Sequence, residues 1–273
     1  MPIARSHLVD DLRRLGLKPG ELVMVHASVR AVGAVHGGPD EIHRAVKEAV
    51  APGGTVMMFV GCQDGFDDVG RGVYSPAQEA EILAHQPPFD PHSARTQRDF
   101  GALAEFFRSS PGTMCSEAVC GRVAARGARA AWLVADAPWN YGFGPGSPFA
   151  KLVEAHGRVL LLGSSHDEVT LLHYAEHIAD FPDKRVVRYR VPWREGGRRV
   201  WRDVEEFNTG GDGVHAHWPH DLFARIFDDF LRTHDGGRGR ISNAESFLLD
   251  AAALVKHAVP LLQRQAAQKE PVL

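Results

Sequence analysis

Short, almost continuous apolar segments recur along the chain, and segments with helical spacing separate them. Three apolar segments have the length and composition of buried strands: LVMVH (22–26), TVMMFVG (55–61) and RVLLLG (158–163). Apolar residues at three- and four-residue intervals predict helices over 8–15, 40–50, 99–110, 147–157 and 170–180. Apolar strands that alternate with helices are typical of an α/β fold whose sheet is covered by helices. We therefore expect a layered mixed sheet flanked by helices, with a smaller helical lobe as a further element.

The last third of the chain has a different pattern. VVRYRV and RRVWRDVEEF flank REGG, which predicts a β-hairpin. Two helices are expected to end the chain, one over HDLFARIFDDFLRTH and one over ESFLLDAAALVKHAVPLL. Ser242 and Glu245 have the spacing of a capping box at the start of the second helix. We predict that residues 1–273 form one domain.

Charge and hydropathy exclude two classes of partner. The chain of 273 residues has a formal charge of −3, whereas a protein that neutralises nucleic-acid phosphates needs a basic surface. The apolar segments are too short to span a bilayer, and the first residues lack the apolar core of a signal peptide. The three cysteines have no paired spacing that would indicate a disulfide framework. We expect a cytoplasmic enzyme that binds neither nucleic acid nor a membrane.

The segment GSSHDEVTLLHYAEHIAD holds the densest group of chemically active side chains. It starts at the end of a predicted strand, where α/β folds place their ligands. His173, Glu176 and His177 lie at positions i, i+3 and i+4, so they share one helix face. The turn before the helix adds Asp167, Glu168 and Thr170. Acids at a helix start and structural histidines are the alternative interpretation, but the position at a strand-to-helix turn favours a functional site.

The same letters match the H-x-x-E-H zinc pattern, in which Glu176 would act as the base. Such a site needs a third protein ligand, which HAHWPH (215–220) could supply. A five-residue match arises easily by chance in a chain with 15 histidines. We therefore rank a zinc hydrolase built on His173, Glu176 and His177 as an alternative and expect no metal.

A glycine-rich segment follows the first predicted strand. This strand ends at His26, and backbone amides between Ser28 and Gly33 can face a ligand there. Arg30 has the charge to pair with a phosphate. Neither a G-x-G-x-x-G nor a P-loop pattern is present in this segment. It is either an ordinary connection or part of a site for a nucleotide-like cofactor.

Several carboxylates lie in predicted loops. Asp64 and Asp67 belong to a polar stretch, residues 62–98, that is too long for a simple connector. Glu168 precedes His173 by five residues, and Glu205 lies at the end of the hairpin. Carboxylates of this kind usually form a solvated face, but around a cleft they attract a polycationic ligand.

Three motifs, in this order, resemble the aminoglycoside 3-N-acetyltransferase family, and the similarity covers nearly the whole chain. The motifs are H-x-S-x-x-x-x-G (His26, Ser28, Gly33), G-x-x-SP-x-x-x-L (Gly144, Ser147, Pro148, Leu152) and T-x-L-H-x-A-E (Thr170, Leu172, His173, Ala175, Glu176). Two positions depart from the family pattern. Many members have Ser-x-His-Pro where this chain has SEAV, which keeps Ser116 but no His-Pro. Many also have an aspartate near Asn208, so the acidic partner of the base can differ here.

The resemblance implies acetyl-coenzyme A as the acyl donor and an amine on the deoxystreptamine ring of an aminoglycoside as the acceptor. It implies His173 as general base, assisted by Thr170, with Glu206 or, less favoured, Glu176 as the carboxylate that orients the ring. The expected donor site consists of His26, Ser28, Val29, Arg30, Ala31, Gly33 and Ser116. The expected acceptor site consists of Asp64, Asp67, Glu168, Glu176 and Glu205.

An aminoglycoside ammonium must lose a proton before its nitrogen can attack a thioester. Histidine has an ordinary pKa close to neutrality, which suits a general base. We therefore expect direct acetyl transfer without a covalent acetyl-enzyme, with backbone amides stabilising the oxyanion. The rival hypotheses are the zinc hydrolase and a non-catalytic protein that binds a nucleotide-like or cationic ligand.

Overall fold

The computed structural model describes residues 1–61, 69, 70, 72–180, 182, 184–209 and 218–268. Within these ranges, seven strands form one sheet in the order β3-β4-β2-β1-β5-β9-β8. The strands are β1 (Leu22–Ala27), β2 (Thr55–Phe59), β3 (Met114–Cys115), β4 (Val123–Gly127), β5 (Arg158–Leu162), β8 (Gly237–Ile241) and β9 (Ala244–Asp250). The central strand β1 is parallel to both β2 and β5, and the outer pairs are antiparallel. The sheet is therefore mixed, as predicted.

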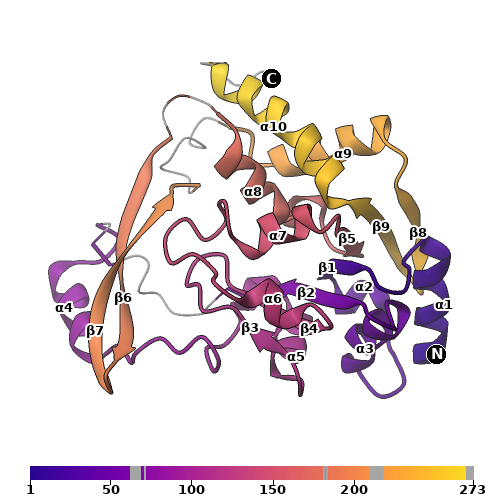
Figure 1. Ribbon diagram of the computed structural model, residues 1–273, viewed down its shortest axis with the longest axis horizontal. Helices are drawn as coiled ribbons and strands as arrows, with labels where there is room; N and C mark the ends of the chain where they lie inside the picture. Colours follow the sequence, from indigo (N-terminus) through magenta and orange to yellow (C-terminus); the bar gives the residue numbers. More distant parts are fainter. Residues whose placement is uncertain (62–68, 71, 181, 183, 210–217, 269–273) are drawn as a thin grey trace.

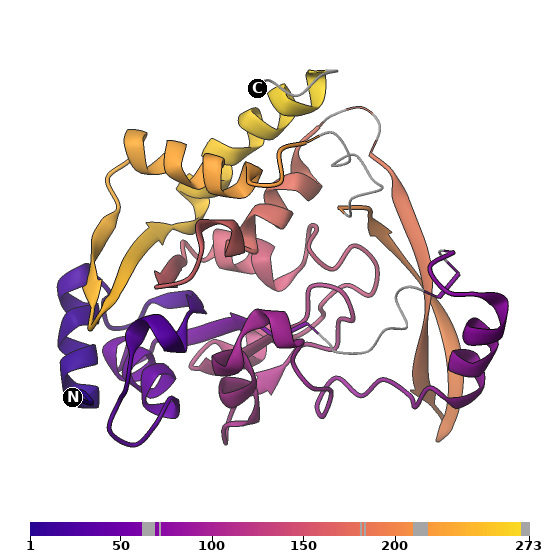
Figure 2. The ribbon, with the colours of Figure 1, turned by 180° about the vertical axis from the view of Figure 1, so that it is seen from behind.

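Helices cover both faces of this sheet (Figures 1 and 2). Along β1, Leu22 and Met24 belong to one apolar cluster, whereas Val23 and Val25 belong to another, because successive side chains of a strand point to opposite faces. The first cluster includes residues of α6 (Ala130–Val134), α7 (Pro148–Glu154), α8 (Leu171–Ile178), α9 (Leu222–Thr233) and α10 (Ala251–Ala267). The second includes residues of α1 (Arg5–Leu15), α2 (Val29–Val32), α3 (Asp40–Ala49) and α5 (Ala102–Ser109). No helix in the described ranges is long and apolar enough to cross a membrane.

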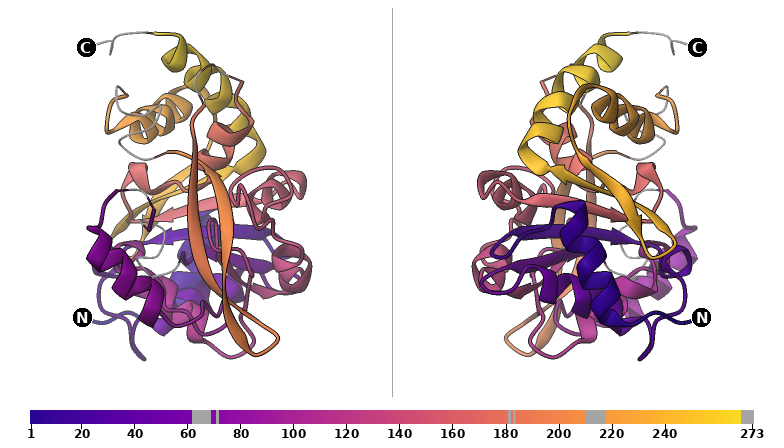
Figure 3. Two further views of the ribbon diagram at one scale, coloured as in Figure 1. Left: turned by 90° about the vertical axis from the view of Figure 1, so that its left-hand side faces the viewer. Right: turned by 90° about the vertical axis from the view of Figure 1, so that its right-hand side faces the viewer.

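The predicted hairpin consists of β6 (Val186–Glu195) and β7 (Arg198–Phe207), joined by Gly196 and Gly197. Both glycines have positive φ, 54° and 77°, which a tight turn between two strands requires. The hairpin stands at one end of the molecule beside α4 (Pro76–His85), and it faces the viewer in the left view of Figure 3. Its inner side packs a separate small apolar cluster of Phe89, Val119, Tyr189, Val191 and Val204.

The predicted start of the last helix is wrong. Residues that were expected to open a helix form strand β9 instead, and β9 pairs with β5 in antiparallel register, with Leu248 opposite Leu160. Ser242 has φ 53° in the turn between β8 and β9, so it caps no helix. The helix begins at Ala251, where the side chain of Asp250 accepts a hydrogen bond of 2.8 Å from the Ala253 amide. The apolar residues 247–249 are locally compatible with a helix or a strand. Residues 244–250 form a strand because they pair with the buried strand β5.

The topology brings two loops to one edge of the sheet. Because β1 and β5 are parallel neighbours, the residues after Ala27 and after Leu162 emerge side by side. A hydrogen bond of 3.0 Å from the Ser28 amide to the Leu162 carbonyl joins the two loops. The β1 loop leads into α2, and the β5 loop leads through the short 3-10 helix η3 (His166–Glu168) into α8. Two of the three motifs therefore meet in space.

Candidate active site

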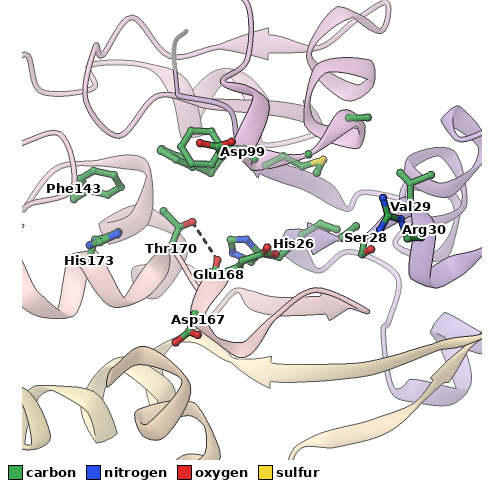
Figure 4. A pocket seen from close by; sticks show the side chains of 17 residues that line it. His26, Ser28, Val29, Arg30, Asp99, Phe143, Asp167, Glu168, Thr170 and His173 are labelled. Carbon is green, nitrogen blue, oxygen red and sulfur yellow. Dashed lines mark hydrogen bonds between the residues drawn. The ribbon is translucent and has the colours of Figure 1, made fainter. Parts of the chain in front are cut away.

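A cavity of about 750 Å³ lies at this edge of the sheet (Figure 4). Its wall comes from the end of β1, the start of α2, the 3-10 helix η2 (Arg98–Phe100) and the segment from η3 to α8. The predicted site residues in the wall are His26, Ser28, Val29, Arg30, Glu168, Thr170 and His173. Asp99, Phe143 and Asp167 line the same cavity.

His173 is held in a fixed orientation at the start of α8. Its Nδ1 lies 2.7 Å from Oε2 of Glu176, which is one helical turn away and whose side chain is completely buried. The imidazole also contacts two aromatic rings, with centroid distances of 5.0 Å to Phe143 and 4.9 Å to Phe223. The side chain of His173 remains 30% exposed, and it lines the cavity.

This geometry assigns a tautomer to His173. An ionised carboxylate can only accept hydrogen bonds, so the proton of a neutral imidazole lies on Nδ1, facing Glu176. Nε2 then carries the lone pair. A histidine whose Nδ1–H is bound by a carboxylate, with Nε2 available to a ligand, is arranged as a general base. Thr170 lies beside it at the start of α8, where its hydroxyl donates to the Glu168 carbonyl at 3.4 Å (Figure 4).

Glu206 does not contact His173, contrary to the favoured prediction. Its Oε1 lies 2.7 Å from Nε2 of His177, and its Oε2 accepts a hydrogen bond of 2.8 Å from the Gly142 amide. Nδ1 of His177 lies 2.7 Å from the carbonyl oxygen of His173. Glu206 therefore contacts His177, one turn further along α8. Glu176, the less favoured candidate, is the carboxylate that contacts His173.

The arrangement disfavours a zinc site. Both ring nitrogens of His177 already contact protein oxygen atoms, so metal binding would break one of these contacts. In the part of the chain that the structure describes, no group of three His, Cys, Asp or Glu residues could hold a metal ion. His215 and His217, two of the candidates for a third ligand, lie outside the described residues.

The donor-site predictions divide into two groups. His26, Ser28, Val29 and Arg30 lie in the cavity wall, whereas Ala31, Gly33 and Ser116 do not line it. Gly33 has φ 91°, and a Cβ there would meet the side chain of Asn243, so turn geometry explains this glycine. Ser116 is completely buried, and its hydroxyl accepts a hydrogen bond of 3.0 Å from the Val123 amide. The structure therefore gives Gly33 and Ser116 structural roles.

The acceptor-site predictions also divide. Glu168 lines the cavity with Asp167 and Asp99, and burial, followed by the nearby Asp167 carboxylate, raises the pKa of Glu168. Glu176 has no exposed surface, so it acts through His173 and cannot reach a ligand itself. Glu205 lies outside the cavity lining and binds Nε of Arg188 at 2.6 Å. Asp64 and Asp67 lie outside the described residues.

Two residues of the cavity wall, Asp99 and Phe143, are not marked by any of the three sequence motifs. Asp99 is the first residue of the predicted helix 99–110, where an acid is common because it interacts with the positive end of the helix dipole. Phe143 immediately precedes Gly144, the first residue of the second motif, so no motif position marks it. In the structure the Ser147 hydroxyl caps α7, accepting from the Ala150 amide at 3.2 Å, and Phe143 packs on His173.

The order of the three motifs along the chain agrees with a known protein family. The family model for aminoglycoside 3-N-acetyltransferase matches residues 24–263, which include the whole cavity wall. The chain belongs to the aminoglycoside 3-N-acetyltransferase family. This membership confirms the resemblance inferred from the three motifs, and with it the predicted class of enzyme, an acyltransferase.

Individual members of the aminoglycoside 3-N-acetyltransferase family match along nearly their full length. Aminoglycoside N(3)-acetyltransferase III of Pseudomonas aeruginosa is 41% identical over 265 residues, which cover 96% of this chain and 94% of that protein. The solved structure of AAC-IIIb in a binary complex with CoASH has a TM-score of 0.90 at 43% identity, covering 97% of this chain and 98% of that chain. The structure of AAC-VIa bound to sisomicin has a TM-score of 0.89 at 35% identity, covering 98% of this chain and 100% of that chain.

Proposed function

We propose that this protein transfers the acetyl group of acetyl-coenzyme A to the 3-amino group of the deoxystreptamine ring of an aminoglycoside, with His173 as general base. The observation that carries the proposal is the contact of 2.7 Å between Nδ1 of His173 and the buried carboxylate of Glu176, beside a cavity that the His173 side chain lines. Relatives with the same fold bind CoASH and sisomicin, which supports this pair of substrates. We infer that the reaction occurs in the cytoplasm, where acetyl-coenzyme A is made.

During the reaction the substrate ammonium loses two protons, and its nitrogen gains the acetyl group. Nε2 of His173 accepts a proton from the substrate ammonium, and the free amine then attacks the carbonyl carbon of the thioester. The carbon–sulfur bond breaks, and the nitrogen loses its second proton as the amide forms. The thiolate takes up one proton from the His173 imidazolium, and the other proton passes to solvent. Glu176 holds the ring and stabilises the imidazolium, because a carboxylate beside Nδ1 favours the protonated ring. No step requires a covalent acetyl-enzyme.

Charged groups in the cavity wall suggest where each substrate binds. Arg30 is exposed, and its guanidinium has no ion pair with any residue in the described ranges, which suits a phosphate of coenzyme A. Asp99, Asp167 and Glu168 line the cavity and suit the ammonium groups of the aminoglycoside. His173 lines the cavity with them, on the same side as Phe143 in Figure 4.

The test is thiol release from acetyl-coenzyme A by the purified protein, measured across a panel of aminoglycosides that have or lack the 3-amino group. We expect release only with compounds that have this group, and a mass increase of one acetyl group on the drug. A matched assay with a metal chelator should leave the rate unchanged. Release without a drug, or none with any member of the panel, would contradict the proposal.

A further inference from the structure

The carboxylate of Asp167 caps helix α9 from a distant part of the chain. The N-cap residue of α9, Asp221, forms no side-chain capping hydrogen bond within the described part of the chain, and its carboxylate lies 2.8 Å from Nε of Arg225. Oδ1 of Asp167 accepts a hydrogen bond of 2.9 Å from the Ala224 amide, 57 positions further along the chain. Ala224 is the third residue of α9, and the amide at this position is one that an N-cap side chain usually binds. Asp167 therefore supplies the cap that Asp221 does not.

The residue before Asp167 joins the same two elements. Nδ1 of His166 lies 2.7 Å from Oδ1 of Asp228 in α9, and the His166 ring lies 4.3 Å from the ring of Phe227. Ala224 and Asp228 are four residues apart, so they lie on one face of α9. The 3-10 helix η3 is therefore bound to α9 at two successive turns, with Asp167 at the first turn.

The first turn of α9 also carries an aromatic neighbour of the proposed base. Phe223 immediately precedes Ala224, and its half-buried ring lies 4.9 Å from the imidazole of His173 at an interplanar angle of 63°. The Asp167 cap holds the backbone of this turn and thereby the position of the Phe223 ring. A chain of contacts thus leads from Asp167 through α9 to His173.

The orientation of His173 depends on such packing. The contact with Glu176 fixes one ring atom, Nδ1, and leaves the imidazole free to turn about the line between Nδ1 and Oε2. Phe223 and Phe143, whose ring centroids lie 4.9 Å and 5.0 Å from that of His173, restrict this turning. A general base must lie within hydrogen-bonding reach of the proton that it accepts, so the orientation of its ring affects kcat.

The charge of Asp167 and its cap have separate consequences. Asp167 lines the cavity, and in the view of Figure 4 Glu168 lies between Asp167 and Asp99. The negative charge attracts an ammonium group and acts on substrate binding. The hydrogen bond to Ala224 needs only an acceptor oxygen, which an amide side chain also has. Substitutions can therefore remove the charge and the cap independently.

We infer that Asp167 is a positioning residue for the base: by capping α9 it holds Phe223 against the ring of His173. The inference rests on the proposed function for the role of His173. It adds to the charge of Asp167 a second role, which is exerted through a helix outside the catalytic segment.

Steady-state kinetics with sisomicin as acceptor and saturating acetyl-coenzyme A test the inference. Asp167→Ala should lower kcat roughly tenfold, part of the loss of about 100-fold that a misplacement of about 1 Å can cause. Asp167→Asn keeps the acceptor oxygen, so it should restore kcat to within twofold of wild type and raise only the KM of sisomicin. Phe223→Leu should lower kcat as much as Asp167→Ala, and the double variant should be no slower than either, because both changes act through one contact.

Asp221 provides a matched control. It is the N-cap residue of the same helix, it is exposed, and its carboxylate binds Arg225. Asp221→Ala should leave kcat unchanged. The ring proton NMR signals of His173 provide a readout that does not need turnover, because an aromatic ring shifts the resonances of nearby protons. In Asp167→Ala these signals should move towards their positions in Phe223→Leu, and in Asp167→Asn and Asp221→Ala they should stay in place.

Three results would overturn the inference. They are a wild-type kcat in a folded Asp167→Ala variant, an equal fall of kcat in Asp167→Asn and Asp167→Ala, and His173 signals that do not respond to Asp167→Ala. The second result would assign the effect to the charge and not to the cap. Absence of acetyl transfer by the wild-type protein would instead contradict the proposed function, while the His173 signals would still test the connection through α9.

Discussion

Nε2 of His177 lies 2.7 Å from Oε1 of Glu206, so a buried pair joins helix α8 to strand β7. The two side chains are only 3% and 7% exposed. Glu206 also fixes the Gly142 amide, and the next residue, Phe143, packs on the ring of His173. The pair therefore acts on the proposed base from outside the cavity, by holding the helix and the aromatic ring that surround it.

Removing the carboxylate of this pair should destabilise the fold. Glu206→Ala leaves His177 and the Gly142 amide without their partner, and we expect the free energy of unfolding to fall by about 3–5 kcal/mol. Glu206→Gln should lose less, because its amide can still bind both groups. Urea unfolding measures the change. The control is Glu205→Ala, which removes a largely exposed ion pair with Arg188 and should have a much smaller effect. Equal losses in the two alanine variants would show that burial of the pair contributes nothing.

Glu176→Gln should lower kcat while the protein stays folded. The amide of glutamine can donate to Nδ1 of His173, which moves the ring proton to Nε2 and removes the lone pair that accepts the substrate proton. A change of tautomer of this kind costs about 10³–10⁴-fold in kcat. Steady-state kinetics at saturating donor, with the Kd of coenzyme A as control, measure this effect. A kcat within threefold of wild type would rule out Glu176 as the partner of the base.

Neutralising a cavity carboxylate should weaken aminoglycoside binding. We expect Asp99→Asn and Glu168→Gln each to raise the KM of the drug roughly fivefold at low salt, because each removes a charge that attracts an ammonium group. The rise should shrink as salt is added, with the Kd of coenzyme A unchanged. Glu205→Gln is the control, since Glu205 lies outside the cavity lining and already binds Arg188. If the KM of the drug is unchanged in both cavity variants, Asp99 and Glu168 do not bind the aminoglycoside.

His26 should make stability depend on pH. Its pKa is lowered to about 4 in the folded protein from 6.5, so between these values the unfolded chain binds the proton and the folded chain does not. Stability is therefore complete above pH 6.5 and falls as the pH is lowered towards 4, by about 3 kcal/mol from this residue. Urea unfolding at pH 7 and pH 4.5 should show a smaller loss for His26→Gln than for wild type. Identical losses would mean that His26 is protonated in the folded protein.

The sequence by itself determined the layers of the fold and part of the cavity wall. Apolar strands such as 22–26 and 158–163 can be stable only when covered on both faces, so alternation with helices dictates a covered sheet. The contact between His173 and Glu176 also follows from local geometry, because residues three apart on a helix are neighbours. The motif carried this information, although we had ranked Glu206 above Glu176.

Only the tertiary structure decided which distant residues meet. His177 and Glu206 are 29 positions apart, and their contact depends on how the hairpin packs against α8. Residues 244–250 became a strand because β5 offered an unpaired edge, which no pattern within that segment reveals. The cavity position of Asp99 and the complete burial of Ser116 likewise depend on how separate elements pack. Spacing rules act over one or two turns of chain, whereas packing of separate elements depends on shapes that the whole fold creates.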